Sequence, residues 1–323
     1  MNKPELPHLT EATLETMIEV IARAKVDDPY ERRMTLDEAR EYTFLDPDFD
    51  PEGSWFAYFD GEAVGFGSCL VESNRVEAGM NEGYVDVDVV PEHRGEDIEQ
   101  TLLDNALTYL RNRKVESALA RCVVGNDHLE RLLTANSFEE AFRVYILKRT
   151  GIEKVREVPI PEDIRLERKV LYDFTDGELE KFVGIFNDAF QDHLNFAPER
   201  KERFVNFRDC RDEPRILTLA IRDEDVVGFC LSEESEKFNR ERGVSTGWID
   251  IIGVRPPHRR KGIGRALLAD GTNWILERGM DTVYLGVFAK NEKALDLYRS
   301  FDFVKERESM WFRKALPQDE KRL

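Results

Sequence analysis

Long apolar runs, paired cysteines and leader-like segments are all scarce in this sequence of 323 residues. No uninterrupted apolar stretch reaches the length of a membrane-spanning helix. The four cysteines (Cys69, Cys122, Cys210 and Cys230) form no C-x-x-C pair, so we expect reduced, mostly buried thiols rather than a disulfide framework. The first residues lack the apolar core of a signal peptide. We therefore expect a cytoplasmic protein without a membrane partner.

Histidine and positive charge are also in short supply. The five histidines show no ligand spacing, which gives no reason to expect a structural or catalytic metal. Lys and Arg number 47 against 65 Asp and Glu, for a formal net charge of −18. Phosphate binding by a nucleic-acid-binding protein needs a basic face, so we expect no nucleic-acid partner. The charge mildly favours a neutral or cationic small molecule, although solubility explains it as well.

The chain instead contains an internal repeat and is long enough for two domains. Segments 59–67, 83–90 and 125–138 recur in the same order about 164 residues later, with one-residue slips in the spacing. A chance match would keep neither order nor spacing. We predict one domain at 1–150 and a second at 164–323, joined by a charged, proline-containing linker at 151–163.

The second half shows a readable succession of elements. Hydrophobic spacing predicts helices over 176–190, 198–207, 262–279 and 291–301, and strands over 164–171, 215–221, 226–232, 247–254, 282–288 and 304–314. The charged stretch 232–243 is expected to form a lid or a solvated hairpin tip. Hairpins combined with a β-α-β crossover indicate an α+β fold.

The stretch HRRKGIGRALL at 258–268 joins a predicted strand to a predicted helix. Unpaired amides at a helix N-terminus favour anions, and glycines let a phosphate approach the backbone. Arg259, Arg260 and Lys261 add positive charge, so the stretch indicates a pyrophosphate cradle. It lacks both the G-K-[ST] ending of a Walker loop and the third glycine of the dinucleotide fingerprint. A basic turn with glycines easing entry into the helix is the alternative.

The counterpart in the first half, HRGEDIEQTLL at 93–103, has lost both glycines. Asp97 stands in place of Gly262, and Glu99 stands in place of Gly264. Two carboxylates and their bulk would oppose a pyrophosphate. We therefore predict that the first copy keeps the fold but has lost the pyrophosphate site.

Two motifs of the second half carry a family resemblance. VRPPHRRKGIGRALL resembles the R/Q-x-x-G-x-G/A signature of the GCN5-related N-acetyltransferases, the GNAT superfamily, with Arg259, Gly262 and Gly264 in the defining places. NEKALDLYRSFDF at 291–303 resembles the second signature of that family. The tandem layout resembles the mycothiol synthase type. The resemblance implies two tandem GNAT (acyl-CoA N-acyltransferase) domains, the second one catalytic, each a mixed, mostly antiparallel sheet flanked by helices.

The resemblance also implies where acetyl-CoA lies, namely between the splayed strands 247–254 and 282–288, with no metal. The residues that it implies for acetyl-CoA binding are Ile252, Gly253, Val254, Arg259, Arg260, Lys261, Gly262, Ile263, Gly264, Arg265 and Asn291. Tyr298 would protonate the leaving thiolate, unless it is merely a packed helix tyrosine; Leu133 replaces it in the first copy.

A general base is expected on the strand before the glycine loop, where Asp250 is the sole carboxylate. By strand alternation Asp250 would share a face with Ile252 and Val254. A solvent-facing or ion-paired Asp250 is the alternative.

The family's acceptor pocket corresponds to residues 189–204, which makes His193, Asn195 and Phe196 candidates unless that segment is an exposed loop. The expected function is an N-acetyltransferase that moves an acetyl group to a primary amine of a small molecule by direct attack, as a monomer or homodimer. Its rivals are a non-catalytic acyl-CoA sensor or partner-binding module, and a nucleotide-binding regulator.

Overall fold

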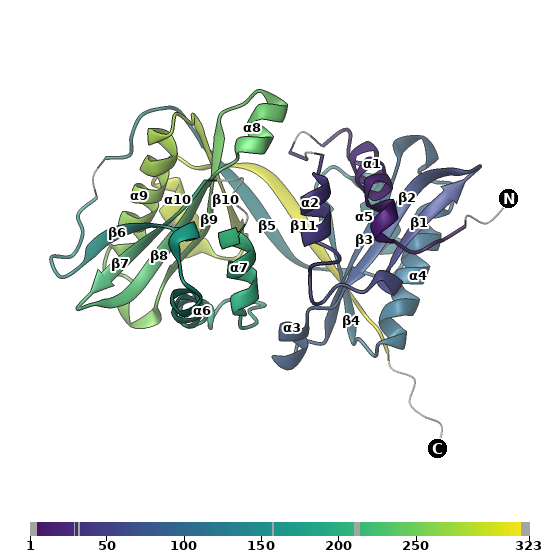
Figure 1. The fold of residues 1–323 in the computed structure, drawn as a ribbon, viewed down its shortest axis with the longest axis horizontal. Coiled ribbons are helices and arrows are strands. Elements are labelled where there is room, and N and C mark those ends of the chain that lie inside the picture. Colours follow the sequence, from purple (N-terminus) through teal and green to yellow (C-terminus); the bar gives the residue numbers. More distant parts are fainter. Residues whose placement is uncertain (1–4, 29, 32, 157, 210–213, 318–323) are drawn as a thin grey trace, which may run out of the picture. The chain divides into compact units, whose positions relative to one another are not determined.

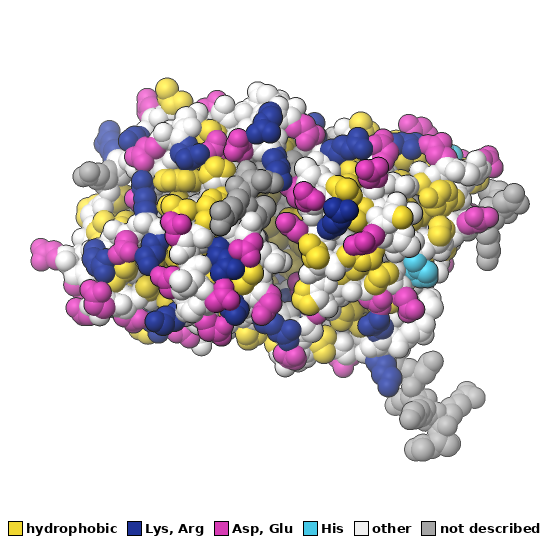
Figure 2. All heavy atoms as spheres, in the orientation of Figure 1, with side chains coloured by type: hydrophobic (Ala, Val, Ile, Leu, Met, Phe, Trp, Pro, Cys, Tyr) yellow, Lys and Arg dark blue, Asp and Glu magenta, His cyan; other side chains and the backbone are white. Residues whose placement is uncertain are grey.

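The computed structural model describes residues 5–28, 30–31, 33–156, 158–209 and 214–317, which fall into two compact units (Figure 1). The N-terminal unit contains the chain up to Phe142 and again from Ser309, and the C-terminal unit contains Arg143–Glu308. Basic and acidic side chains are interspersed over the face shown in Figure 2. Within the described ranges, no helix is both long and apolar enough to cross a membrane.

The N-terminal unit is a mixed sheet with helices. Its strands are β1 (Ser54–Phe59), β2 (Glu62–Leu70), β3 (Glu82–Val89), β4 (Ser117–Val123) and the end of β11 (Val304–Ala315), in the order β1-β2-β3-β4-β11. Only β3 and β4 run parallel. Its helices are α1 (Leu14–Ala24), α2 (Leu36–Glu41), α3 (Ser73–Glu77), α4 (Ile98–Asn112) and α5 (Asp127–Ala135).

The C-terminal unit repeats this plan. Its sheet has the order β5-β10-β9-β8-β7-β6, and only β9 and β10 are parallel. Its strands are β5 (Glu139–Thr150), β6 (Arg165–Val170), β7 (Arg215–Arg222), β8 (Asp225–Glu234), β9 (Thr246–Val254) and β10 (Thr282–Phe288). Its helices are α6 (Asp176–Phe190), α7 (Lys201–Asp209), α8 (Glu236–Arg242), α9 (Ile263–Glu277) and α10 (Glu292–Arg299). The predicted α+β class, with two copies of a mostly antiparallel sheet, is confirmed.

The last strand of each sequence copy lies in the other unit. Strand β5 pairs with β10, with Leu147 opposite Leu285, and β11 pairs with β4, with Phe312 opposite Ala120. The boundaries predicted from sequence keep β5 with the first copy and β11 with the second, so the structure differs there. Both strands are long and half-buried, and such a pattern does not say which of two similar sheet edges a strand will join.

Two cores fill the two faces of the C-terminal sheet. The core under α9 and α10 contains Leu267 and Ile275, and the core under α6 and α7 contains Phe186 and Phe204. Helix α6 begins at a capping box in which the backbone nitrogen of Thr175 donates to Glu178 at 2.9 Å. These two cores fix the faces to which the side chains of β9 point.

The structure shows the conformation of the stretch 232–243, the start of α7 and the state of the described cysteines. The stretch 232–243 was expected as a lid or hairpin tip, but it contains the helix α8, which ends at Gly243 in a left-handed conformation (φ 66°). Helix α7 begins at Lys201, three residues after Pro198. Cys69, Cys122 and Cys230 are buried free thiols as predicted, whereas Cys210 lies outside the described residues.

The predicted linker, 151–163, contains no helix or strand where it is described, and it lies against α9. The backbone of Val155 exchanges two hydrogen bonds with the side-chain amide of Asn273, at 2.7 and 3.1 Å. Val155 and Val158 pack against the core under α9. This segment is therefore docked along the C-terminal unit.

Candidate active site

Strands β9 and β10 separate halfway along their length. Their parallel pairing joins Thr246–Ile249 to Thr282–Leu285 and stops there. Beyond that point β9 continues to pair with β8 on its other edge, with Ile252 opposite Cys230. From Asp250 to Val254 one backbone edge of β9 is thus left without β10 as a partner, in the splayed arrangement that the sequence resemblance implied.

A β-bulge lies at the point of separation. On β8, Leu231 pairs with Ile251 and the next residue, Ser232, pairs with Ile249, so Asp250 is the extra residue of β9. The bulge puts Ile249 in the core under α9 and Ile251 in the core under α6. The charged groups that act on Asp250 come from α7, β7 and β8.

The expectation that Asp250 shares a face with Ile252 and Val254 is therefore wrong. Those two residues pack against the core under α9. Simple alternation fails because the extra residue shifts the period of two by one position.

Asp250 is exposed to solvent, yet its surroundings raise the pKa of its carboxyl to about 6. Crowding by the surrounding protein, which removes water from the charged form, is the largest cause, and the Glu233 carboxylate adds repulsion. Arg203 and Arg215 act in the opposite direction, and Arg215 also donates to Glu233 at 2.9 Å. A carboxylate with this pKa is ionised at neutral pH and is suited to accept a proton.

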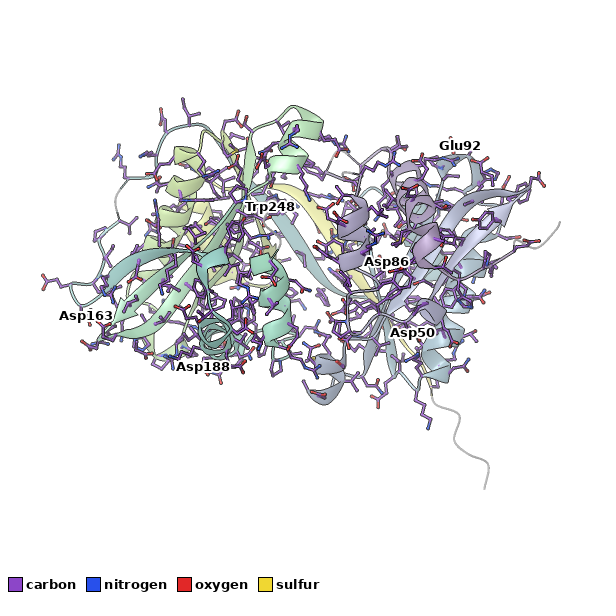
Figure 3. All side chains as sticks on the ribbon, in the orientation of Figure 1. Asp50, Asp86, Glu92, Asp163, Asp188 and Trp248 are labelled. Carbon is purple, nitrogen blue, oxygen red and sulfur yellow. The ribbon has the colours of Figure 1, made fainter. Side chains whose placement is uncertain are left out.

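An aromatic pair stands beside Asp250 on the same side of the sheet. Trp248, labelled on β9 in Figure 3, and Tyr284 on β10 are register partners, and their rings stack with centroids 5.2 Å apart. Our sequence analysis named neither residue. The position of Trp248 two residues before Asp250 was a usable signal, but Tyr284 required the register between the two strands.

The glycine loop after β9 leaves a row of backbone amides unpaired. Arg260 and Gly262 adopt left-handed conformations (φ 66° and 87°), and the first helical bond of α9 runs from the Ala266 nitrogen to the Gly262 oxygen at 3.1 Å. The amides of residues 260–265 donate to no atom of the described chain. Arg260 and Lys261 are exposed and likewise make no ion pair within the described ranges. These groups together favour a polyanion.

The space beside Gly264 is open, whereas the Pro159 oxygen of the linker would lie 3.7 Å from a Cβ added to Gly262. A Cβ added to Gly264 would meet its nearest neighbour, Val254, at 3.8 Å, which is ordinary contact. The packing of the protein therefore does not demand glycine at this position. A ligand that approaches the backbone closely would instead explain why this position is glycine.

Arg259 has a different role from its two cationic neighbours. Its guanidinium donates to the Val254 oxygen at 2.9 Å and to the Ala189 oxygen at 2.8 Å, and it forms an ion pair with Asp192. Arg94, its counterpart in the N-terminal unit, donates to the equivalent carbonyls of β3 and α1. Arg259 thus ties the loop to the end of α6, and its charge is already neutralised.

The equivalent loop of the N-terminal unit is closed by its own side chain. The buried carboxylate of Glu99 lies 3.3 Å from the backbone nitrogen of Gly95, which donates to it, and it also forms a short contact with His128. Gly95 corresponds to Arg260. In the N-terminal unit, the Glu99 carboxylate therefore occupies the Gly95 amide. In the C-terminal unit, the corresponding amide of Arg260 is free to bind a ligand.

Two residues of the second motif lie on α10. Tyr298 is 6% exposed within the core under α9, and its hydroxyl makes no hydrogen bond with the described residues. Burial raises its pKa, so the hydroxyl holds its proton. Asn291 caps α10 by accepting from the Ala294 nitrogen at 3.2 Å, and Asn126 caps α5 in the same way. Helix capping therefore accounts for the asparagine in both copies.

The predicted acceptor residues cluster at the end of α6. The His193 ring packs edge-on against Phe190 at 4.6 Å, and burial lowers its pKa. Phe196 packs against the core under α6, and Asn195 adopts a left-handed turn (φ 62°). The contacts of His193 and Phe196 link them to this helix end rather than to Asp250.

Comparison with known proteins agrees with this geometry. The model of the acetyltransferase (GNAT) family matches residues 18–138 and 179–303, one match in each sequence copy. The chain therefore belongs to the GNAT family and is an acetyl-CoA-dependent N-acyltransferase by that membership.

The chain is also similar to curated acetyltransferases and to solved structures. A mycothiol acetyltransferase of Saccharomonospora viridis is 26% identical over 86% of this chain and 92% of its own length. Another, from Propionibacterium freudenreichii, is 30% identical but covers 47% of this chain and 46% of its own. The fold is similar to a GCN5-related N-acetyltransferase from Sphaerobacter thermophilus, with a TM-score of 0.72, 20% identity and coverage of 98% and 97%. It is also similar to a tandem GNAT protein from the clavulanic acid biosynthesis pathway, with a TM-score of 0.75, 13% identity and coverage of 98% and 99%.

Proposed function

We propose that this protein transfers the acetyl group of acetyl-CoA to a primary amine of a small molecule, with its active site in the C-terminal unit. One observation supports placing the active site in the C-terminal unit. The amides of residues 260–265 are free to bind an anion, whereas in the N-terminal unit Glu99 already accepts from the corresponding loop. A pyrophosphate would meet hydrogen-bond donors in one unit and a buried carboxylate in the other.

The donor substrate would lie along the free edge of β9. The backbone of Ile252, Gly253 and Val254 supplies hydrogen-bonding groups there, next to the point where β10 diverges. The amides through Ile263, Gly264 and Arg265 would hold the pyrophosphate, with Arg260 and Lys261 adding charge. Arg259 positions this loop through Val254 and Ala189, and Asn291 caps the start of α10.

The reaction needs one new bond and two proton movements. The amine nitrogen attacks the thioester carbonyl carbon, forms the C–N bond and expels the CoA thiolate as the C–S bond breaks. The Asp250 carboxylate accepts the proton that the nitrogen loses, directly or through a water molecule. The Tyr298 hydroxyl donates its proton to the sulfur. The products are an amide and CoA thiol.

The surface around Asp250 favours an amine with an apolar or ring-shaped body. Asp250 and Glu233 supply negative charge for an approaching ammonium group, and the Trp248–Tyr284 stack supplies a flat apolar surface beside them. His193, Asn195 and Phe196, at the end of α6, would contact more distant parts of the acceptor. The names of the relatives make a mycothiol-type acceptor one candidate.

The test is an acetyl-transfer assay on the purified chain. Acetyl-CoA is offered with amino sugars, aminoglycosides, polyamines, amino acids and a mycothiol-type amine, and CoA thiol release and acetylated product are both measured. We expect product with at least one amine class, and product formation about 10²-fold slower with Asp250→Asn at the same protein concentration. Tight acetyl-CoA binding without product from any amine would support the non-catalytic sensor instead.

A further inference from the structure

We propose that the N-terminal unit contains a second small-molecule site, which takes a zwitterion of the α-amino-acid class with an apolar side chain. The site is a pocket of about 270 Å³ where β3 and β4 diverge. Its wall is formed by Leu70, Tyr84, Asp86, Leu119, Arg121 and Trp311. All of these residues belong to the N-terminal unit, so the pocket is complete within it.

The strand geometry brings two opposite charges to the mouth of this pocket. The parallel pairing of β3 with β4 ends at Val85 and Ala120. Asp86 and Arg121 are the next residues on their strands, on the face that also carries Tyr84 and Leu119. Asp86, labelled in Figure 3, and Arg121 thus stand on two neighbouring strands where these begin to separate.

Asp86 and Arg121 act electrostatically on Lys25, but neither forms an ion pair with it. Neither Asp86 nor Arg121 forms an ion pair or hydrogen bond with the described residues, and they do not pair with each other although both line one pocket. Lys25, at the C-terminal end of α1, lies 3.5 Å from Asp88 and 3.9 Å from Glu31, and these two carboxylates raise its pKa more than Asp86 does. One free carboxylate and one free guanidinium beside a cavity are complementary to a ligand that carries both charges.

The rest of the pocket is apolar, and its aromatic rings pack against one another. The Trp311 ring stacks on Phe142 with centroids 5.6 Å apart and meets the edge of Tyr84 at 5.8 Å. Leu70 and Leu119 complete the apolar wall. An α-ammonium group would bind Asp86, an α-carboxylate would bind Arg121 through two parallel N–H donors, and the side chain would lie against Trp311. The volume lies below the roughly 300–1,000 Å³ of drug-sized pockets and suits an amino acid.

The same position in the C-terminal unit is built differently. The register partner of Arg121 on the neighbouring strand is Trp311, and the corresponding pair in the C-terminal unit is Gly286 and Ile146. The C-terminal unit therefore has neither a guanidinium in place of Arg121 nor an aromatic ring in place of Trp311. The pocket is not simply a duplicate of the acetyl-transfer site, and its proposed ligand does not depend on the proposed function.

The charges are tested with three matched ligands and isothermal titration calorimetry on the full chain. L-phenylalanine carries both charges, phenethylamine only the ammonium group, and 3-phenylpropionate only the carboxylate. We expect saturable binding of L-phenylalanine at one site per chain, at least ~10-fold tighter than either analogue. No saturable binding of L-phenylalanine up to about 10 mM, or equal affinity for all three ligands, would overturn the proposal.

Variants locate the site. Asp86→Asn and Arg121→Gln should each weaken L-phenylalanine binding at least ~10-fold. Asp86→Asn should abolish the advantage over 3-phenylpropionate, and Arg121→Gln the advantage over phenethylamine. Both side chains are exposed, so the fold should survive, which thermal unfolding will check. Arg131→Gln, an exposed arginine of α5 outside the pocket, is the matched control and should bind like wild type. Wild-type affinity in both pocket variants would place the ligand elsewhere and refute the site.

Discussion

Asp97 and Gly262 hold the same place in the two units, each immediately before a helix and each with left-handed backbone (φ 63° and 87°). An aspartate thus adopts a conformation in one copy that glycine provides in the other. Two positions later, Glu99 turns its carboxylate onto the loop of the N-terminal unit, whereas Gly264 leaves the equivalent space open. The fold accommodates both Asp97 with Glu99 and Gly262 with Gly264. The two pairs differ in whether the loop can bind an anionic ligand.

This relationship predicts what happens when the acidic residues of the N-terminal loop are introduced into the C-terminal loop. Gly262→Asp with Gly264→Glu should weaken acetyl-CoA binding at least ~10-fold, which needs only about 1.4 kcal/mol. Two like charges about 5 Å apart cost roughly 3 kcal/mol at an effective dielectric near 20, and salt reduces that value. Calorimetry measures the affinity, and circular dichroism should show a native fold because Asp97 and Glu99 are tolerated at a matching helix start.

The matched control carries the opposite change in the other unit. Asp97→Gly with Glu99→Gly should leave the affinity of the C-terminal site unchanged. A folded Gly262→Asp, Gly264→Glu protein that binds acetyl-CoA like wild type would show that the cradle lies elsewhere.

The closed loop of the N-terminal unit predicts the binding stoichiometry. One CoA should bind per chain, because the Gly95 amide is already used by Glu99 while the corresponding Arg260 amide is free. Titration calorimetry with CoA at known active protein concentration checks this. Two equivalent sites per chain would contradict the argument from Glu99.

Two glycines near the site should respond to alanine in opposite ways. A Cβ on Gly253 would lie 2.8 Å from the Phe229 ring and 3.1 Å from Phe190, so Gly253→Ala should destabilise the fold by about 1–3 kcal/mol. Gly264 has open space and helical backbone, so Gly264→Ala should change the unfolding free energy by less than about 1 kcal/mol, towards greater stability. Chemical denaturation separates the two. A strongly destabilised Gly264→Ala would mean that packing, not ligand approach, requires this glycine.

Tyr298 tests the proposed acid. Tyr298→Phe should keep acetyl-CoA affinity, because the ring still packs in the core under α9, but it should lower kcat by about 10²-fold. Tyr284→Phe is the control, since its ring stacks on Trp248 and has no proposed role in proton transfer. Unchanged kcat in Tyr298→Phe, with chemistry shown to be rate-limiting, would reduce Tyr298 to a packing residue.

Asp250 predicts a pH dependence of catalysis. Its pKa of about 6 means that the proton-accepting form predominates above that pH, so kcat/KM should rise with pH through about 6 and then level off. Asp250→Asn should remove this limb and lower the plateau by about 10²-fold. An unchanged acidic limb in the variant would assign it to another group.

Asp250 also predicts a pH dependence of stability, and its direction is opposite to that of catalysis. The pKa is higher in the folded state than the ordinary value of 3.8, so this group makes the fold less stable as pH rises between 3.8 and about 6. Asp250→Asn should therefore be no less stable than wild type at pH 7. Loss of activity with retained stability would separate a role in proton transfer from a structural one.

The sequence alone determined most elements of the C-terminal half, although not α8, and it determined the difference between the loops. Helix 176–190 and strand 282–288 agree with the structure at both ends. The helix is marked by an amphipathic period and by the capping threonine Thr175, and the strand by a short run of apolar residues. The replacement of Gly262 and Gly264 by Asp97 and Glu99 was visible as a change of residue type in a repeated frame. The sequence predicts these features because each depends on residues that are close to one another in the chain.

Only the tertiary structure decided where long-range pairing puts each residue. The slip in the spacing of the repeat was visible, but the pairing of β8 with β9 places the extra residue at Asp250 and turns it towards α7. The exchange of β5 and β11, the Trp248–Tyr284 stack and the pocket beside Asp86 likewise depend on which strands become neighbours. A half-buried strand pattern fits more than one edge and more than one register, so the choice between them is made by packing between residues that are far apart in the chain.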